Sequence, residues 1–429
     1  MENRVLFFAI FFLLLHPLAA TSHNISAVFA FGDSTLDAGN NNRLHTIARA
    51  DHVPYGRELP GHLPSGRFSD GRLITDFVVS ALGLKDLLPP YSAADRLDLS
   101  DIATGVSFAS AGSGLDDLTA SQSQVMTMAE ELSNFAAYTE RLTAALGKDK
   151  AQEIIGGALF VIGAGSNDWM INYYISPIRS RMYSKTDYSR LLIGKLRSVV
   201  EEIYNRGGRK FAISGLPPLG CLPLQITLNA MVPINDATQR SCVVAQNNDA
   251  ATYNSLFQRS INALSASLIE GKFVYVDIYT PLINMIQNPK RYGFESTTLG
   301  CCGTGTVEMG PLCNALTPLC SAPSSFMFWD SVHPSEATYK ALAEEMIKDV
   351  LPKYKFDSLQ NNNHINYRMQ KLRRPLHFCL LPPAGAPPIA AEKRSSPKSD
   401  AEAEKLARLA RSNPSAVVTL HSTLTSLGG

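Results

Sequence analysis

Short apolar runs alternate with longer amphipathic stretches along the first 353 residues of the chain. Compact runs of this kind are typical of buried strands, and apolar positions spaced three and four apart are typical of helices. We expect strands within 26–31, 105–114, 158–168, 210–220 and 273–279. We expect helices over 72–84, on the stripes Val125–Phe135 and Leu192–Ile203, over roughly 245–269, and after Pro334 with Ser335 as the cap.

Strands that are separated by helix-length segments indicate an α/β fold, with a mostly parallel sheet covered by helices on both faces. In such sheets ligands gather at the carboxyl ends of the strands. Three predicted strand ends carry small polar clusters, which are Gly-Asp-Ser at 32–34, Ala-Gly-Ser-Gly at 111–114 and Gly-Ser-Asn-Asp at 165–168. A site is therefore expected at this edge.

The N-terminus has the pattern of a secretory signal peptide. Arg4 precedes an apolar run of eleven residues, 5–15, which is too short for a transmembrane helix of about 20 residues. Small residues follow, so we predict a signal peptide over 1–22 that is cleaved between Ala19 and Ser22. No other segment is long and apolar enough to span a membrane, and the mature protein is expected outside the cell or in the cell wall.

The charge is distributed unevenly. The 429 residues carry a net charge of +1, which gives no electrostatic reason to expect nucleic acid as a partner. Residues 361–429, however, hold ten Lys/Arg against four Asp/Glu, and 380–388 is rich in proline. We predict that 26–353 forms the folded domain and that 356–429 is a basic, mostly disordered tail with one short helix near 400–411.

Secretion changes the meaning of the cysteines. In an oxidising compartment six cysteines in the body favour up to three disulfides. We expect one bridge between Cys221 and Cys242 and pairing of Cys301, Cys302, Cys313 and Cys320 among themselves. A zinc cluster of the last four is the weaker reading, because the CxxC spacing is missing. Asn24 begins the N-x-S/T sequon and is the predicted glycosylation site.

The apolar run from Ala27 to Phe31 ends in Gly-Asp-Ser, so Ser34 is either part of a turn or a nucleophile at a strand end. A serine hydroxyl needs a base, which is most often histidine. Of the nine histidines, His333 is the candidate in the body that lies outside the early polar loop and near a suitable carboxylate. Asp330 lies three residues earlier, a spacing that brings both side chains to one side of a turn. The alternative is that Asp330 simply caps the helix after Pro334.

Acyl transfer also needs donors for the developing oxyanion. Gly112 and Asn167 lie at the appropriate strand ends, and the Ser34 N–H lies beside them in the predicted sheet edge. Taken singly, Gly112 could merely permit a turn and Asn167 could cap a helix. Asp33 and Asp37 flank the serine and are expected to support the site without reacting.

Four ordered blocks carry a family resemblance: "FGDSTLDAGNNN", "GVSFASAGSG", "GSND" and "DSVHP". With "PYG", "PSGRFSDGRLITDF", "GLPPLGCLP" and "GCCGTG", they resemble the plant extracellular branch of the GDSL (SGNH-hydrolase) esterases and lipases over about 26–353. The resemblance implies a three-layer α/β/α, flavodoxin-like fold with Ser34 as nucleophile, His333 as base, Asp330 orienting it, and Gly112 and Asn167 as oxyanion donors. Thr35, Ser107 and the tail depart from the family pattern.

We therefore expect a secreted, monomeric serine esterase or lipase that cleaves lipid-type carboxylic esters through an acyl-enzyme, without metal or cofactor. An extracellular acyltransferase that uses the same triad is an alternative, since alcohol could replace water in the second step. A non-catalytic binding protein on the same fold is a weaker one. The stretches 43–63 and 170–186 carry no readable selectivity for the acyl group.

Overall fold

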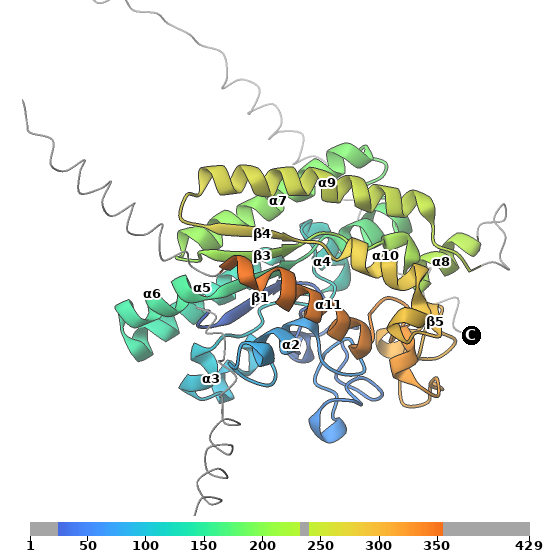
Figure 1. The fold of residues 1–429 in the computed structure, drawn as a ribbon, viewed down its shortest axis with the longest axis horizontal. Helices are drawn as coiled ribbons and strands as arrows, with labels where there is room; N and C mark the ends of the chain where they lie inside the picture. Colours follow the sequence, from blue (N-terminus) through green and yellow to red (C-terminus); the bar gives the residue numbers. More distant parts are fainter. Residues whose placement is uncertain (1–24, 232–239, 355–429) are drawn as a thin grey trace, which may run out of the picture. The chain divides into compact units, whose positions relative to one another are not determined.

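Four parallel strands form the central sheet of the computed structural model, which describes residues 25–231 and 240–354. They lie in the order β1–β2–β3–β4 and pair in register, Gly32 with Gly163, Ile162 with Ile213, and Ser214 with Val276. All four carboxyl ends therefore meet at one edge (Figure 1). The bounds are β1 (Val28–Gly32), β2 (Leu159–Gly163), β3 (Lys210–Ser214) and β4 (Lys272–Val276), which confirms four predicted strands at shorter lengths.

The strand predicted within 105–114 is the exception, because this segment is not a regular strand. It runs parallel to β1 through Val28 N–H to Thr104 O (3.2 Å) and Ser110 N–H to Gly32 O (2.9 Å), with isolated bridges from Ser107 to Ala30 on one side and to Pro90 on the other. Its outer side faces Pro89 and Pro90, and prolines have no N–H to extend a ladder there. With this segment beside β1, the spatial order is that of flavodoxin-like sheets.

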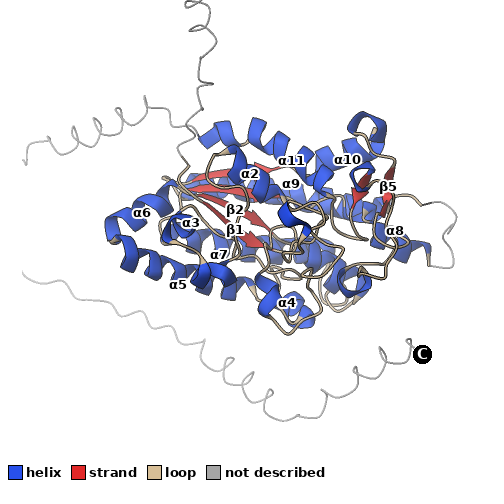
Figure 2. Ribbon diagram, turned by 90° about the horizontal axis from the view of Figure 1, so that it is seen from below, coloured by secondary structure: helices blue, strands red, loops and turns tan. Residues whose placement is uncertain are grey.

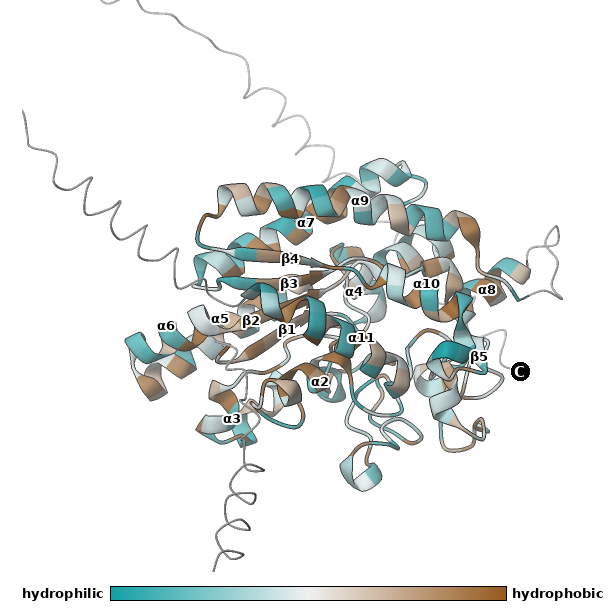
Figure 3. Cartoon of the chain, in the orientation of Figure 1, coloured by the Kyte–Doolittle hydropathy of each residue, from teal (hydrophilic) through white to brown (hydrophobic). Residues whose placement is uncertain are grey.

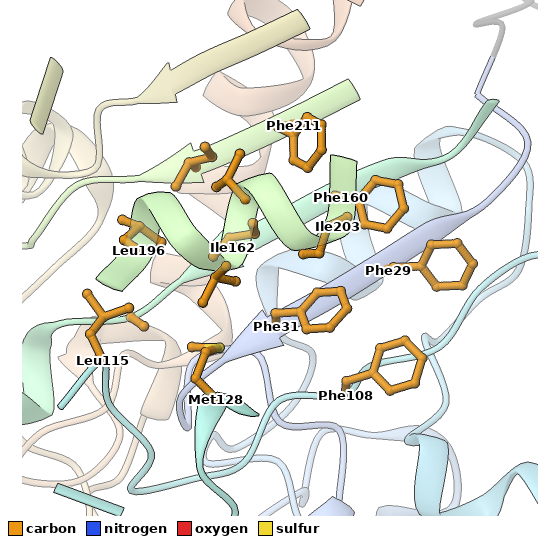
Figure 4. Packing of buried hydrophobic residues seen from close by; sticks show 14 of the residues in the cluster. Phe29, Phe31, Phe108, Leu115, Met128, Phe160, Ile162, Leu196, Ile203 and Phe211 are labelled. Carbon is orange, nitrogen blue, oxygen red and sulfur yellow. The ribbon is translucent and has the colours of Figure 1, made fainter. Parts of the chain in front are cut away.

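One face of the sheet is aromatic. Phe29, Phe31, Phe160 and Phe211 alternate with smaller residues along their strands and lie on the same side (Figure 4). Buried residues of α5 (Met128–Leu146), α6 (Lys148–Gly157), α7 (Lys185–Asn205) and α9 (Val244–Ser267) pack against this face.

The opposite face carries smaller residues, among them Ala30, Val161, Ala212 and Val276. Two helices cover it, α2 (Ile74–Ala81) and α11 (Glu336–Asp349), and Figure 2 shows them on the side of the sheet opposite α5 and α7. The predicted three-layer α/β/α architecture is confirmed. Figure 3 shows the hydropathy expected for this architecture: the central strands are largely hydrophobic (brown), and the helices that surround them alternate hydrophobic and hydrophilic residues (brown and teal).

The helices predicted within 26–353 are all present, whereas the one predicted near 400–411 lies outside the described residues. The periodic stretches correspond to α2, α5, α7, α9 and α11, and the Ser335 hydroxyl accepts a hydrogen bond from Thr338 N–H at the start of α11. Shorter helices lie in the connections: α3 (Leu99–Ala103), α4 (Asp117–Ser123), α8 (Pro223–Ala230), α10 (Tyr279–Gln287) and a π-helix over Asp168–Ile175.

Beyond the carboxyl edge a second, two-stranded sheet forms from β5 (Ser296–Gly300) and β6 (Phe326–Phe328). The described part of the chain holds three disulfides: the expected Cys221–Cys242 bridge, and Cys301–Cys320 and Cys302–Cys313 beside the small sheet. Within 25–231 and 240–354, no cluster of His, Cys, Asp or Glu could hold a metal ion.

No helix of these residues has the length and apolarity to cross a bilayer. The predicted signal peptide (1–22), Asn24 and the tail (356–429) lie outside the described residues.

Candidate active site

Ser34 lies immediately beyond β1, at the start of a helical turn. The turn forms because Leu36 and Asp37 donate their N–H groups to Asp33 O, both at 3.0 Å. The Asp33 carboxylate accepts from both the N–H and the hydroxyl of Thr35, at 3.0 and 2.8 Å, which fixes the residues on either side of the serine. Burial raises the pKa of Asp33, while the Thr35 hydrogen bonds and the nearby His333 act in the opposite direction.

Gly32 lets β1 approach β2 closely enough for this turn. Its φ is +133°, and a Cβ there would lie 1.9 Å from Gly163 O, so no other residue fits. Behind it, Glu131 from α5 reaches the sheet edge, and its Oε2 accepts the Gly32 N–H at 2.8 Å. Burial raises the pKa of Glu131 well above its ordinary value.

The structure brings Ser34, His333 and Asp330 into one hydrogen-bonded chain. Ser34 Oγ lies 2.8 Å from His333 Nε2, and His333 Nδ1 lies 2.7 and 2.9 Å from the two Asp330 oxygens. All three side chains are buried, with 7%, 5% and 0% of their residues' surface exposed. Asp330 Oδ1 also accepts the N–H groups of Val332 and His333, which closes the turn between the two residues. The alternative that Asp330 caps the following helix is wrong, because the cap of α11 is Ser335.

Tyr55 supports Asp330 from the far side. Its hydroxyl donates to Asp330 Oδ2 at 2.7 Å and accepts the Gly310 N–H at 2.8 Å. Gly310 lies in the loop that the Cys302–Cys313 disulfide closes. Phe68 packs against His333, the hydrogen-bond partner of Asp330, with their ring centroids 4.6 Å apart. The disulfide-bonded loop is thereby linked to the Asp–His pair.

Asn167 joins the same site through the loop that carries Gly112. Its side-chain amide donates to Ser113 O at 2.9 Å, which leaves its second N–H for another acceptor. Asn167 lines a cavity together with Ser34 and His333, whereas Gly112 lies on the neighbouring loop and is not among the residues that line it. Gly112 has a φ of +84°, a conformation that favours glycine.

Two buried carboxylates hold that loop. Asp37 Oδ2 accepts the Ala111 N–H at 3.0 Å, and its Oδ1 accepts the N–H groups of Gly39 and Asn40. Asp168 accepts the N–H groups of Leu115 and Asp116, both at 2.9 Å. Burial raises the pKa of Asp37 to about 6 and that of Asp168 to about 7, against their backbone hydrogen bonds.

Sequence reasoning missed several of these supporting residues. Tyr55, Phe68, Glu131 and Asp168 were not predicted to contribute to the site. A signal was present for three of them, because Tyr55 stands in "PYG", Phe68 in "PSGRFSDGRLITDF" and Asp168 in "GSND". Glu131 lies in an ordinary helical stretch, and nothing in its surroundings distinguishes it.

A serine hydroxyl in contact with an imidazole, itself in contact with a buried carboxylate, can pass its proton to nitrogen as it attacks a carbonyl. On the edge of a doubly wound sheet, this arrangement defines a hydrolase-type site. Residues 28–346 match the model of the GDSL-like Lipase/Acylhydrolase family. The chain belongs to this family and is a carboxylic ester hydrolase, whose substrate is a small-molecule ester.

Two plant relatives agree with this assignment. The GDSL esterase/lipase At2g40250 of Arabidopsis thaliana is 44% identical over 78% of this chain and 92% of its own length. The GDSL esterase/lipase At1g58430 of the same plant is 44% identical over 75% and 88%. Among solved structures, a catalytic mutant of the acetylxylan esterase Axe2 from Geobacillus stearothermophilus is 14% identical, with a TM-score of 0.33 over 77% of this chain and 95% of its own.

Proposed function

We propose that this protein hydrolyses lipid-type carboxylic esters with Ser34 as nucleophile, His333 as general base and acid, and Asp330 as the group that orients the imidazole. The observation that carries the proposal is the chain of contacts from Ser34 Oγ through His333 to Asp330, at 2.8 and 2.7 Å. It lies beside a cavity whose walls are largely apolar, which suits an ester with a hydrocarbon chain.

The first step forms an acyl-enzyme. Ser34 Oγ attacks the acyl carbon, and its proton moves to His333 Nε2. Asp330 stabilises the imidazolium that results. The oxyanion accepts hydrogen bonds from the second Asn167 amide N–H and from the Gly112 and Ser34 N–H groups, and His333 then protonates the departing alcohol.

The second step reverses the roles with water. His333 removes a proton from a water molecule, which attacks the acyl carbon, and the bond to Ser34 Oγ breaks as His333 returns the proton to that oxygen. The products are the carboxylic acid and the free enzyme. The three disulfides support an oxidising, secreted setting for this activity.

Replacing the nucleophile tests the proposal. Ser34→Ala should lower kcat for p-nitrophenyl butyrate by several orders of magnitude, because losing a triad nucleophile removes the covalent route. It should also abolish labelling by a fluorophosphonate. Ser198→Ala, in α7 and away from the site, is the matched control, since its hydroxyl bonds only the Gly194 carbonyl of its own helix. Turnover and labelling that persist in Ser34→Ala would refute the assignment.

A further inference from the structure

The face of the sheet beneath α11 leaves space close to Ser34. Near the carboxyl edge this face presents Gly163, Ala212 and Ser214, whereas the opposite face presents the larger Ile162, Phe211 and Ile213 at neighbouring positions. Small side chains cannot fill the distance between a sheet and the helix that covers it. A cavity of about 110 Å³ lies there.

One face of α11 forms the roof of this cavity. Tyr339, Leu342 and Met346 all line it, at the three- and four-residue spacing that places side chains on one side of a helix. From Tyr339 to Met346 the helix advances roughly 10 Å. The floor comes from β2, β3 and β4, through Val161, Ala212 and Val276. The cavity therefore runs from the sheet edge back beneath the helix.

The walls are polar at one end only. Ser34, Asn167 and His333 line the cavity at the sheet edge. Tyr339 also lines it; it is 2% exposed, and its hydroxyl has no hydrogen-bond partner among the described residues. Buried hydroxyls are nearly always paired, so this one is available to an oxygen atom of a ligand or to water. Beyond it the walls are aliphatic.

A second hollow of about 260 Å³ lies next to the cavity, between β4, α10 and α11. Its rim is charged, with Asp277, Glu345, Asp349 and Lys353. The residues that line both hollows are Ile74, Val276, Ile278, Leu342 and Met346.

We propose that this apolar cavity is an acyl tunnel: it receives the acyl chain of a medium-chain ester, with the carbonyl at Ser34 and the hydrocarbon lying under Leu342 and Met346. This inference rests on the proposed function and deepens it, because it names the part of the substrate that the enzyme recognises. An octanoyl chain is comparable in length to the Tyr339–Met346 span.

The acyl part suits the tunnel better than the alcohol part. The acyl group stays bound to Ser34 through both steps, whereas the alcohol has to leave between them and water has to enter. An enclosed apolar site therefore holds the group that remains, and the exchange of alcohol for water takes place on the open side of His333. Burial of the chain in aliphatic surroundings supplies the binding free energy.

Two isomeric esters test this orientation. Ethyl octanoate carries the long chain on the acyl side, and octyl acetate carries it on the alcohol side, with the same atoms in total. We expect kcat/KM to be at least about ten-fold higher for ethyl octanoate, given what a few buried methylenes contribute to discrimination. Equal values, or a preference for octyl acetate, would overturn the proposal.

Variants of α11 test the position of the chain. Leu342→Trp should lower the ratio of p-nitrophenyl octanoate to p-nitrophenyl acetate hydrolysis at least about ten-fold, and Met346→Ala should shift the preferred chain to a longer one. Ile347→Trp lies on the same helix but lines neither hollow, so it should leave the ratio unchanged. Thermal unfolding of each variant checks that it is folded. An unchanged ratio in both cavity variants, or an equal change in Ile347→Trp, would refute the proposal that the acyl chain lies under α11.

The tunnel can fail independently of the triad. If wild type hydrolyses p-nitrophenyl acetate and Ser34→Ala does not, the proposed function holds whatever the chain-length result. Binding gives a readout without turnover: octanoate, but not acetate, should raise the melting temperature of Ser34→Ala in proportion to the logarithm of its concentration. Absence of that rise contradicts the tunnel alone.

Discussion

Tyr55→Phe removes the hydroxyl group that donates a hydrogen bond to Asp330 on the side away from His333, and it should lower both stability and activity. The Tyr55 hydroxyl is fully buried, donates to Asp330 Oδ2 at 2.7 Å and accepts from Gly310 N–H at 2.8 Å. Burial and the Asp330 charge raise the pKa of Tyr55 well above 10, so it acts as a neutral donor. Phenylalanine keeps the ring and deletes both bonds.

The size of the effect follows from those bonds. A hydrogen bond to a charged group is worth about 1.5–3 kcal/mol, and an unpaired buried N–H costs about 1–3 kcal/mol. Together they lower the expected free energy of unfolding by roughly 2.5–6 kcal/mol. A loss of about 1.4 kcal/mol of transition-state stabilisation lowers the rate ten-fold. If misplacement of Asp330 costs about 1.4 to 2.8 kcal/mol of that stabilisation, kcat/KM falls about 10- to 100-fold.

Tyr138→Phe is the matched control. Tyr138 is equally buried, and its hydroxyl donates to Ile102 O at 2.8 Å in the aromatic core, away from the triad. It should lose stability without losing kcat/KM. Urea unfolding gives the stability of each variant, and hydrolysis of p-nitrophenyl acetate gives kcat/KM. If Tyr55→Phe keeps wild-type kcat/KM, or if Tyr138→Phe loses as much, Tyr55 does not position Asp330.

Two further predictions concern groups around the same site. Because burial raises the pKa of Asp168 to about 7, the folded state retains a proton that the unfolded state releases above about pH 4, so stability falls as pH rises to 7. Urea unfolding should show wild type losing about 2–3 kcal/mol more than Asp168→Asn between about pH 5 and pH 8, and parallel pH curves would contradict this. Replacing Cys302 and Cys313 by serine should lower stability by about 2–4 kcal/mol. In that background Tyr55→Phe should cost little additional kcat/KM, since both changes release Gly310; full additivity would count against this link.

The fold could be predicted because its signals are local. Runs such as 158–163 are apolar over the length of one strand, and stripes such as Leu192–Ile203 have helical spacing. The segment at 105–114 could not be resolved in this way. Its residues are suited to a strand, but the prolines that deny it a regular outer partner lie some fifteen residues earlier, at 89 and 90. Pairing of that kind depends on tertiary structure.

The residues expected to react were predicted together because their chemistry is restrictive. Few positions in the body offer a serine at a strand end and a histidine three residues after an aspartate, and the structure brings Ser34, Asp330 and His333 into contact. The supporting residues obey weaker rules. Tyr55 lies 275 positions from Asp330, and Glu131 lies 99 from Gly32. Any buried tyrosine or glutamate could have met those donors and acceptors.

The buried acids have one physical origin. Loops at the carboxyl edge of a parallel sheet leave N–H groups that no neighbouring strand accepts, and such groups need partners when they are buried. Asp37 and Asp168 accept those of the loop around Gly112, and Glu131 accepts that of Gly32. Each carboxylate thereby fixes a loop and loses hydration, which is why the pKa of each is raised by burial. A substitution that removes the cost of ionising such a buried carboxylate also removes hydrogen bonds that hold the loop. We therefore expect Asp168→Asn to gain stability above pH 7 while it loses kcat. A gain in both would show that the loop is held by other contacts.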